Sequence, residues 1–143
     1  MNKPRLIITN VLVFVVTGII AFVGVPFWAF SYGFDTTEII TTIVLFFVTG
    51  MSITAGYHRL WAHKTYEAHP VVKVFLAIGG AMALQNSILH RSSDHRVHHR
   101  HVDVNDKDPY SAKKGFWFSH MGWMLREYQA ESYGDYRNCK DLL

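Results

Sequence analysis

The chain has very little cysteine and, over long stretches, no charge. Cys139 is the one cysteine among 143 residues, which excludes an internal disulfide, and without a second thiol it offers no zinc-thiolate or redox pair. Leu6–Phe30 holds no charged residue across 25 positions, and Ile39–Tyr57 holds none across 19. Both runs exceed what a core helix of a soluble protein needs, so each predicts a membrane-spanning helix.

The first apolar run predicts a retained span and not a secretory signal, because it is too long and no small-residue cleavage site follows it. The polar loop Ser31–Glu38 is short, and Asp35 and Glu38 have the spacing of a capping box for the next helix. We therefore expect a tight helical hairpin, with spans at about residues 6–30 and 36–63.

The distribution of charge predicts the orientation of this hairpin. The formal net charge is +3, and basic residues alternate with acidic ones, which does not indicate a nucleic-acid partner. Lys3 and Arg5 precede the first span and Arg59 and Lys64 lie at the end of the second, while the loop between them carries only acidic charges. The positive-inside rule then places the N-terminus and everything after the second span on the cytoplasmic side.

A third apolar segment, residues 70–90, is expected to form a helix that does not span. A crossing would put the histidines before it and those after it on opposite sides of the bilayer. We expect this helix, broken at Gly79-Gly80, to lie buried or at the membrane interface. Residues 91–143 are more polar and predict a cytosolic or interfacial segment. The expected fold is thus an all-α integral membrane protein, in which a transmembrane helical hairpin carries a cytosolic helical cap within one domain.

Two groups of histidines carry the chemistry, His58-Arg-Leu-Trp-Ala-His63 and His95-Arg-Val-His-His99. In the second group the i, i+3, i+4 spacing places three imidazoles on one helical face. In the first group five residues separate the pair, roughly 140° around an ideal α-helix, so one α-helical face cannot carry both. Either the helix unwinds there, or the two side chains bind different ions.

Clustered imidazoles repel one another when protonated, and a bound metal removes that difficulty. Without thiolate or convincing carboxylate ligands nearby, the set favours iron, copper, zinc or nickel over calcium or magnesium. The alternative is a solvated basic face at the lipid headgroups. Asp94 could orient a ligand ring or pair with Arg91, and His120 could be a structural or ligand-orienting residue, whereas His69, His90 and His101 are expected at the surface or at helix ends.

These motifs resemble the membrane fatty-acyl desaturases of the Δ9, or stearoyl-CoA desaturase, type. Gly56-Tyr-His-Arg-Leu-Trp-Ala-His63 resembles the first histidine box of that family and Asp94-His-Arg-Val-His-His99 the second. The likeness includes Gln85-Asn86, Asp108-Pro109 and the aromatic stretch Gly115–Leu125, which by composition is suited to a helix on the membrane surface.

The resemblance implies a non-haem diiron centre on the cytoplasmic face, which uses O2 and two electrons to insert a cis double bond into a long-chain acyl thioester. The electrons would come from a ferredoxin, a rubredoxin or a cytochrome. The implied iron ligands are five histidines: His58, His63, His95, His98 and His99. Asn86 would contact the acyl-CoA near its entrance, and Lys113 and Lys114 would meet CoA phosphates or lipid headgroups.

The chain departs from the family pattern in two places. Arg91-Ser-Ser93 stands where the family commonly has an aromatic residue, alanine and arginine, and the third histidine box and a second pair of spans are absent. Five ligands would leave two irons under-coordinated, so we expect a partial domain that is inactive alone. The alternatives are a related diiron hydroxylase or alkane oxidase, and a non-catalytic membrane metal-binding protein.

Overall fold

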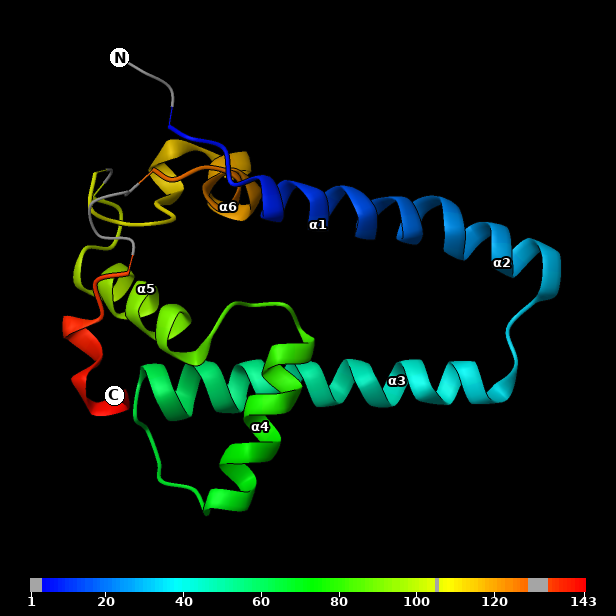
Figure 1. Ribbon diagram of the computed structural model, residues 1–143, viewed down its shortest axis with the longest axis horizontal. Helices are drawn as coiled ribbons and strands as arrows, with labels where there is room; N and C mark the ends of the chain where they lie inside the picture. Colours follow the sequence, from blue (N-terminus) through cyan, green and yellow to red (C-terminus); the bar gives the residue numbers. More distant parts are fainter. Residues whose placement is uncertain (1–3, 105, 129–133) are drawn as a thin grey trace.

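In the computed structural model, which describes residues 4–104, 106–128 and 134–143, two long rods carry a smaller helical cap at one end (Figure 1). The first rod joins α1 (Ile8–Ile19), a π-helical turn (Ile20–Gly24) and α2 (Val25–Tyr32). The second joins α3 (Thr36–Met51) to a π-helical segment, η2 (Ser52–Ala62). The rods have 25 and 27 residues and are long and apolar enough to cross a membrane.

The cap follows the second rod. It contains α4 (Pro70–Met82), α5 (Ile88–Arg100), the short turn Ala112–Lys114, the π-helical turn Phe118–Gly122 with α6 (Trp123–Leu125), and η5 (Arg137–Leu142). An isolated bridge between Leu6 and Arg126 is the one β-type pairing among the described residues. The expected all-helical fold, with two long apolar helices and a histidine-bearing helical region after them, is confirmed.

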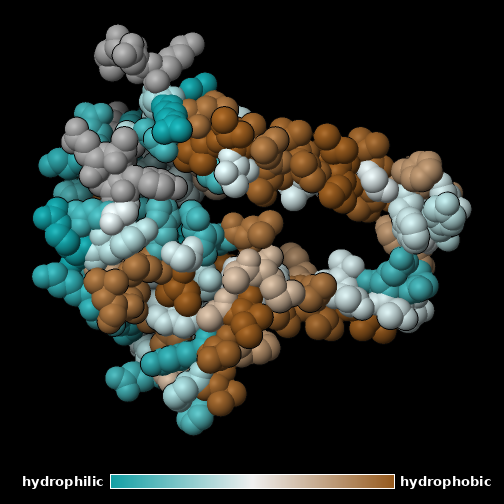
Figure 2. Space-filling model, in the orientation of Figure 1, coloured by the Kyte–Doolittle hydropathy of each residue, from teal (hydrophilic) through white to brown (hydrophobic). Residues whose placement is uncertain are grey.

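The connection between the rods is tight, because Gly33 adopts a φ of 73°. Asp35 accepts a hydrogen bond from the Glu38 backbone N–H at 2.8 Å, and the Glu38 carboxylate accepts one from the Asp35 N–H at 2.9 Å. The predicted capping box is therefore confirmed. The two rods nevertheless stand apart (Figures 1 and 2), and no described residue of the first rod is buried. The short loop reverses the chain direction, but the two rods do not pack against each other along their length.

The short apolar helix α4 crosses the second rod and packs against η2 (Figure 1). The expected break at its two glycines is wrong, since the helix continues through both to Met82. A Cβ on Gly79 would overlap the Ser52 side chain, and one on Gly80 would overlap the Tyr57 ring. The glycines therefore permit close helix packing instead of interrupting the helix.

The polar start of the chain is tied to the end of the cap. The Ile7 N–H donates to the Leu125 carbonyl at 2.9 Å, and the Glu127 N–H donates to the Arg5 carbonyl at 2.9 Å. The Asn10 side chain adds a hydrogen bond to the Met124 carbonyl at 2.7 Å. Residues more than a hundred positions apart thus meet, and the first rod enters the cap beside α6 (Figure 1). Lys3, used above to predict orientation, lies outside the described residues.

Candidate metal centre

The first histidine pair lies on one face because the helix that carries it is π-helical. Along η2 the backbone hydrogen bonds are of the i→i+5 type, and the last of them joins the His63 N–H to the His58 carbonyl at 3.0 Å. A turn that closes over five residues brings positions i and i+5 close together. The two imidazole centroids are accordingly 4.5 Å apart. An ideal α-helix could not carry both rings on one face, and of the two alternatives the helix does depart from α-helical geometry, by widening to a π-helix.

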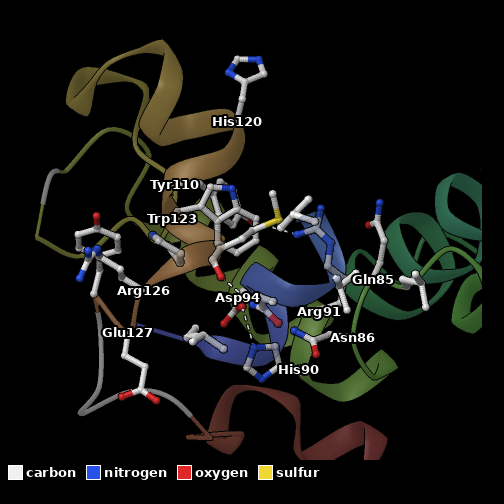
Figure 3. A pocket seen from close by; sticks show the side chains of 18 of the residues that line it. Gln85, Asn86, His90, Arg91, Asp94, Tyr110, His120, Trp123, Arg126 and Glu127 are labelled. Carbon is white, nitrogen blue, oxygen red and sulfur yellow. Dashed lines mark hydrogen bonds and ion pairs between the residues drawn. The ribbon is translucent and has the colours of Figure 1, made fainter. Parts of the chain in front are cut away.

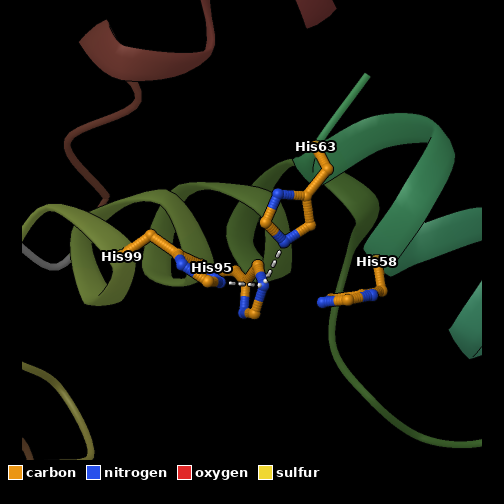
Figure 4. Close-up of side chains that lie close together, drawn as sticks. All are labelled: His58, His63, His95 and His99. Carbon is orange, nitrogen blue, oxygen red and sulfur yellow. Dashed lines mark hydrogen bonds between the residues drawn. The ribbon is translucent and has the colours of Figure 1, made fainter. Parts of the chain in front are cut away.

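Four histidines converge where η2 meets α5 (Figure 4). One nitrogen from each of His58, His63, His95 and His99 lies within 4.8 Å of the others. His63 Nε2 and His95 Nε2 are 2.9 Å apart, and His95 Nε2 and His99 Nε2 are 3.1 Å apart. Imidazole nitrogens bound about 2.1 Å from one ion in adjacent positions are separated by about 3 Å. The donor set therefore fits a single transition-metal ion.

The surroundings of His63 and His95 favour uncharged rings, which is the form that binds a metal. Burial of the His95 ring, together with the positive charge of Arg91, lowers the pKa of His95 to about 3. Loss of hydration, with the neighbouring His99 and Arg96, holds the pKa of His63 below its usual range. Three of the four residues, His58, His63 and His99, are exposed, yet the ring centroid of His63 lies 4.5 Å from that of His58 and 4.6 Å from that of His99. The contact between the four rings favours the metal-site interpretation over that alternative.

His98 stands outside this group of four. Its Nδ1 donates a hydrogen bond of 2.8 Å to the Asp108 carboxylate, and its ring centroid lies 4.5 Å from that of Tyr110. A histidine that donates through Nδ1 presents its other nitrogen, Nε2, as the metal-binding atom. The five predicted ligands are thus divided by the structure into a cluster of four and a separately oriented fifth.

Asp108 is the residue that sequence reasoning missed. Its side chain is fully buried, and it accepts hydrogen bonds from His98 and from the backbone N–H groups of Asp103 and Tyr110, at 2.8, 2.8 and 3.1 Å. Burial raises the pKa of Asp108, but these three hydrogen bonds outweigh burial, so the pKa falls below its usual range. The sequence shows the Asp108-Pro109 pair only as part of the likeness to the family, whereas the direction of the carboxylate depends on the fold.

The two predicted ligand-orienting residues lie elsewhere. Asp94 pairs with His90, its Oδ2 lying 3.3 Å from His90 Nε2, and Arg91 is close enough to act on its carboxylate. Burial raises the pKa of Asp94 against the opposing effect of its cationic neighbours. His120 is exposed, stacks on Phe116 with centroids 4.1 Å apart, and donates to the Phe116 carbonyl at 2.9 Å. Neither side chain belongs to the group of four histidines.

A cavity of about 880 Å³ lies beside α5 (Figure 3), and none of the four clustered histidines is among its lining residues. It is lined by residues of the first rod, of the loop after α4, of α5 and of the aromatic stretch; among them are Asn10, Asn86, Arg91, Asp94, Tyr110 and Trp123. Its size is that of a small-molecule site. The predicted substrate contact Asn86 lies in its wall, as does His120, whereas Lys113 and Lys114 are not among the lining residues. Arg91 also borders a smaller cavity that reaches His58 and His95.

Comparison with known proteins adds the family context. Residues 36–140 match the family described as "Fatty acid desaturase". The chain is 50% identical over 107 residues to a "Probable acyl-CoA desaturase" of Schizosaccharomyces pombe, covering 71% of this chain and 22% of that protein. It is 37% identical over 143 residues to the "Delta(9)-fatty-acid desaturase fat-6" of Caenorhabditis elegans, covering 99% and 41%.

A third relative, the "Stearoyl-CoA desaturase" of Bos taurus, is 46% identical over 112 residues, which is 75% of this chain and 31% of that protein. The chain therefore spans less than half the length of each of these relatives.

Proposed function

The chain belongs to the fatty acid desaturase family, and from this premise we propose that it is the part of a membrane acyl-CoA desaturase that bears the first two histidine boxes. The observation that carries the proposal is the convergence of four imidazoles from two helices within 4.8 Å. The proposed reaction is the O2-dependent insertion of a cis double bond at the Δ9 position of a long-chain acyl thioester. The relatives whose names state a Δ9 or stearoyl-CoA activity support this choice.

The proposed cofactor is a pair of non-haem irons, which supplies the oxidising power that no side chain has for removing hydrogen from an unactivated methylene. His58, His63, His95 and His99 would hold one ion, and His98 would contribute to the other through Nε2. Asp108 would fix the orientation of the His98 ring. Five imidazoles are too few for two irons, so we propose that this chain binds metal but needs further donors for turnover.

The chain's own residues would position the substrate. Arg91 lies in the wall of the larger cavity, with Asn86 and Asn10, and also in the wall of the cavity of about 10 Å³ at His58 and His95. Because none of the four histidines lines the larger cavity, we propose that it holds a part of the acyl thioester remote from the reacting carbons. We propose Asn86 and Asp94 as contacts to the polar part of the thioester. Lys113 and Lys114, outside the cavity wall, are proposed to meet CoA phosphates or lipid headgroups, and His120 is proposed to orient the aromatic stretch.

We propose that the two rods cross the bilayer, with the N-terminus and the cap on the cytoplasmic side. Exposed apolar side chains cover both rods (Figure 2), whereas Arg59 and Lys64 lie at the cap end of the second rod. The partners would be the bilayer, the acyl-CoA and a soluble or membrane redox donor of ferredoxin, rubredoxin or cytochrome type. Nothing in the charge pattern favours a nucleic acid.

Metal content tests the centre directly. The chain, purified in lipid nanodiscs with Fe²⁺ and analysed by mass spectrometry for metals, should retain iron. His95→Ala removes the imidazole shared by two of the short nitrogen contacts, so we expect at least about tenfold less iron, while His101→Ala should match wild type. Equal iron in wild type and His95→Ala would refute the assignment.

Product analysis tests the reaction. A protein that contains these residues and has the full length of the relatives should convert a long-chain acyl-CoA into an unsaturated product. The His98→Ala variant of that protein should form no such product. An alcohol as the product would instead establish the related hydroxylase chemistry. Iron retention and turnover that are both undiminished in His98→Ala would contradict the role given to that ring.

A further inference from the structure

Arg96 of the second histidine box is hydrogen-bonded to backbone carbonyls of the first box. Its guanidinium uses all five of its N–H donors. Nε donates to the Ala62 carbonyl at 3.0 Å and Nη2 to the Trp61 carbonyl at 2.7 Å. Nη1 donates to the Asn138 carbonyl at 2.7 Å, and the two terminal nitrogens also donate to the Asp141 carboxylate at 2.7 and 3.0 Å. The side chain is only 16% exposed.

The positions of these acceptors relate Arg96 to the centre. Ala62 and Trp61 are the last residues of the π-helical segment, where carbonyls have no partner within the helix, and His63 follows them directly. Arg96 itself follows His95. One planar group therefore fixes the end of η2 against α5 at the point where the Nε2 atoms of His63 and His95 lie 2.9 Å apart.

The segment Arg137–Leu142, which we call the strap, completes the arrangement. Asp141 binds Arg96 on one side and Lys64 Nζ, at 2.9 Å, on the other. Asn138 exchanges hydrogen bonds with Ser93 of α5, at 2.8 and 3.0 Å, and Cys139 is fully buried beside them. The strap thus contacts α5 and the residue after His63, although none of its side chains belongs to the group of four histidines.

We propose that Arg96 and Asp141 are positioning residues, and that the strap sets the metal affinity and coordination geometry of a centre that it does not touch. This inference rests on the proposed function, since it requires that the four histidines bind a metal. The guanidinium is specifically required, because an ammonium group offers three donors from one point and cannot bridge two carbonyls and a carboxylate in a plane. Loss of either partner should let the two boxes move relative to each other while each box keeps its own histidines.

The test uses Co²⁺ bound to the chain in lipid nanodiscs, because its visible absorption reports the coordination geometry. Arg96→Lys and Asp141→Asn should each weaken Co²⁺ binding about tenfold and change the position or intensity of the visible bands. The matched control is the other arginine–aspartate pair of the region, Arg137 with Asp135, joined at 2.6 Å with Arg137 85% exposed. Arg137→Lys and Asp135→Asn should leave both the affinity and the spectrum as in wild type.

Three results would overturn the proposal. One is a wild-type spectrum and affinity in Asp141→Asn and Arg96→Lys, even if thermal stability falls, because the pair would then be merely structural. Another is an equal change in the control variants. A third is a loss of affinity without any spectral change in either test variant. If Arg96→Lys does not fold, Asp141→Asn decides alone, because it leaves the carbonyl contacts of Arg96 in place. Absence of Co²⁺ binding by the wild-type chain would refute the proposed metal centre itself.

Discussion

Replacing Asp108 by asparagine tests whether the buried carboxylate organises the second part of the centre. Oδ1 of Asp108 accepts from His98 Nδ1 at 2.8 Å and from the Tyr110 N–H at 3.1 Å, and Oδ2 accepts from the Asp103 N–H at 2.8 Å. An asparagine has one acceptor oxygen. If that oxygen takes the place of Oδ1, the amide NH2 faces the Asp103 N–H; if it takes the place of Oδ2, His98 and Tyr110 both lose their acceptor.

The magnitude follows from this count. Either orientation leaves at least one buried N–H without an acceptor, which costs about 1–3 kcal/mol. The retained bonds also lose the charge assistance of a carboxylate, which roughly halves their strength. We expect Asp108→Asn to lower the free energy of unfolding by about 2–4 kcal/mol, and the melting temperature by on the order of 5–10 °C for a chain of this size. Metal affinity at the site to which His98 contributes should fall about 10–100-fold.

The assay is thermal unfolding followed by circular dichroism in detergent, combined with the metal titration. Asp106→Asn is the control, because Asp106 lies two residues earlier and is exposed, and it should change the melting temperature by less than about 1 °C. A melting temperature of Asp108→Asn equal to that of Asp106→Asn would show that the network around Asp108 does not stabilise the cap. Unchanged metal binding in a folded Asp108→Asn variant would remove its role in orienting His98.

Two further predictions concern packing and pH. Gly80→Ala should destabilise the fold by about 1–3 kcal/mol, since the added methyl group would overlap the Tyr57 ring, whereas Gly50→Ala, with open space around it, should be neutral or stabilising in the same melting assay. Hydrogen bonds from Arg96 hold the pKa of Asp141 well below its usual range. The ionised Asp141 therefore contributes fully to stability above the pKa of the unfolded state, about 3.9. This contribution is lost as the pH falls toward the pKa of the folded state. The difference in melting temperature between wild type and Asp141→Asn should therefore narrow between about pH 5 and pH 2, and a constant difference would contradict the carboxylate's role.

The elements that sequence reasoning predicted well depend on local composition. Charge-free runs of 25 and 19 residues have few alternatives to long apolar helices, and a capping box needs only two side chains three residues apart. The i, i+3, i+4 pattern of His95, His98 and His99 likewise fixes their angular positions on α5. In these cases the residues that determine the structure are neighbours in the sequence.

The details of the centre could not be predicted in the same way. The spacing of His58 and His63 does not reveal that η2 is π-helical. Interpreted as α-helical, the same spacing would place the two side chains on different faces. The partner of His98 is ten residues away, across a turn. Arg96 meets acceptors 34 to 45 residues distant, and nothing local distinguishes it from the other arginines. Each of these features depends on contacts that exist only after the elements have packed.

Different interactions hold the histidine site and the two rods. The stability of the site therefore does not depend on how far apart the rods stand. No described residue between Ile8 and Tyr32 is buried, whereas the fully buried side chains are Ser52, Ser92, Asp108, Ser111 and Cys139, at the base of η2 and in the cap. Without water to drive association, apolar faces in lipid gain little from contact with each other, so the distance between the rods costs little. The cap is different, because the buried Asp108 carboxylate must keep the hydrogen bonds from its three partners. The two rods stand apart, while Arg96, Asp108 and the glycines of α4 hold the histidine-bearing helices through contacts that do not involve the first rod.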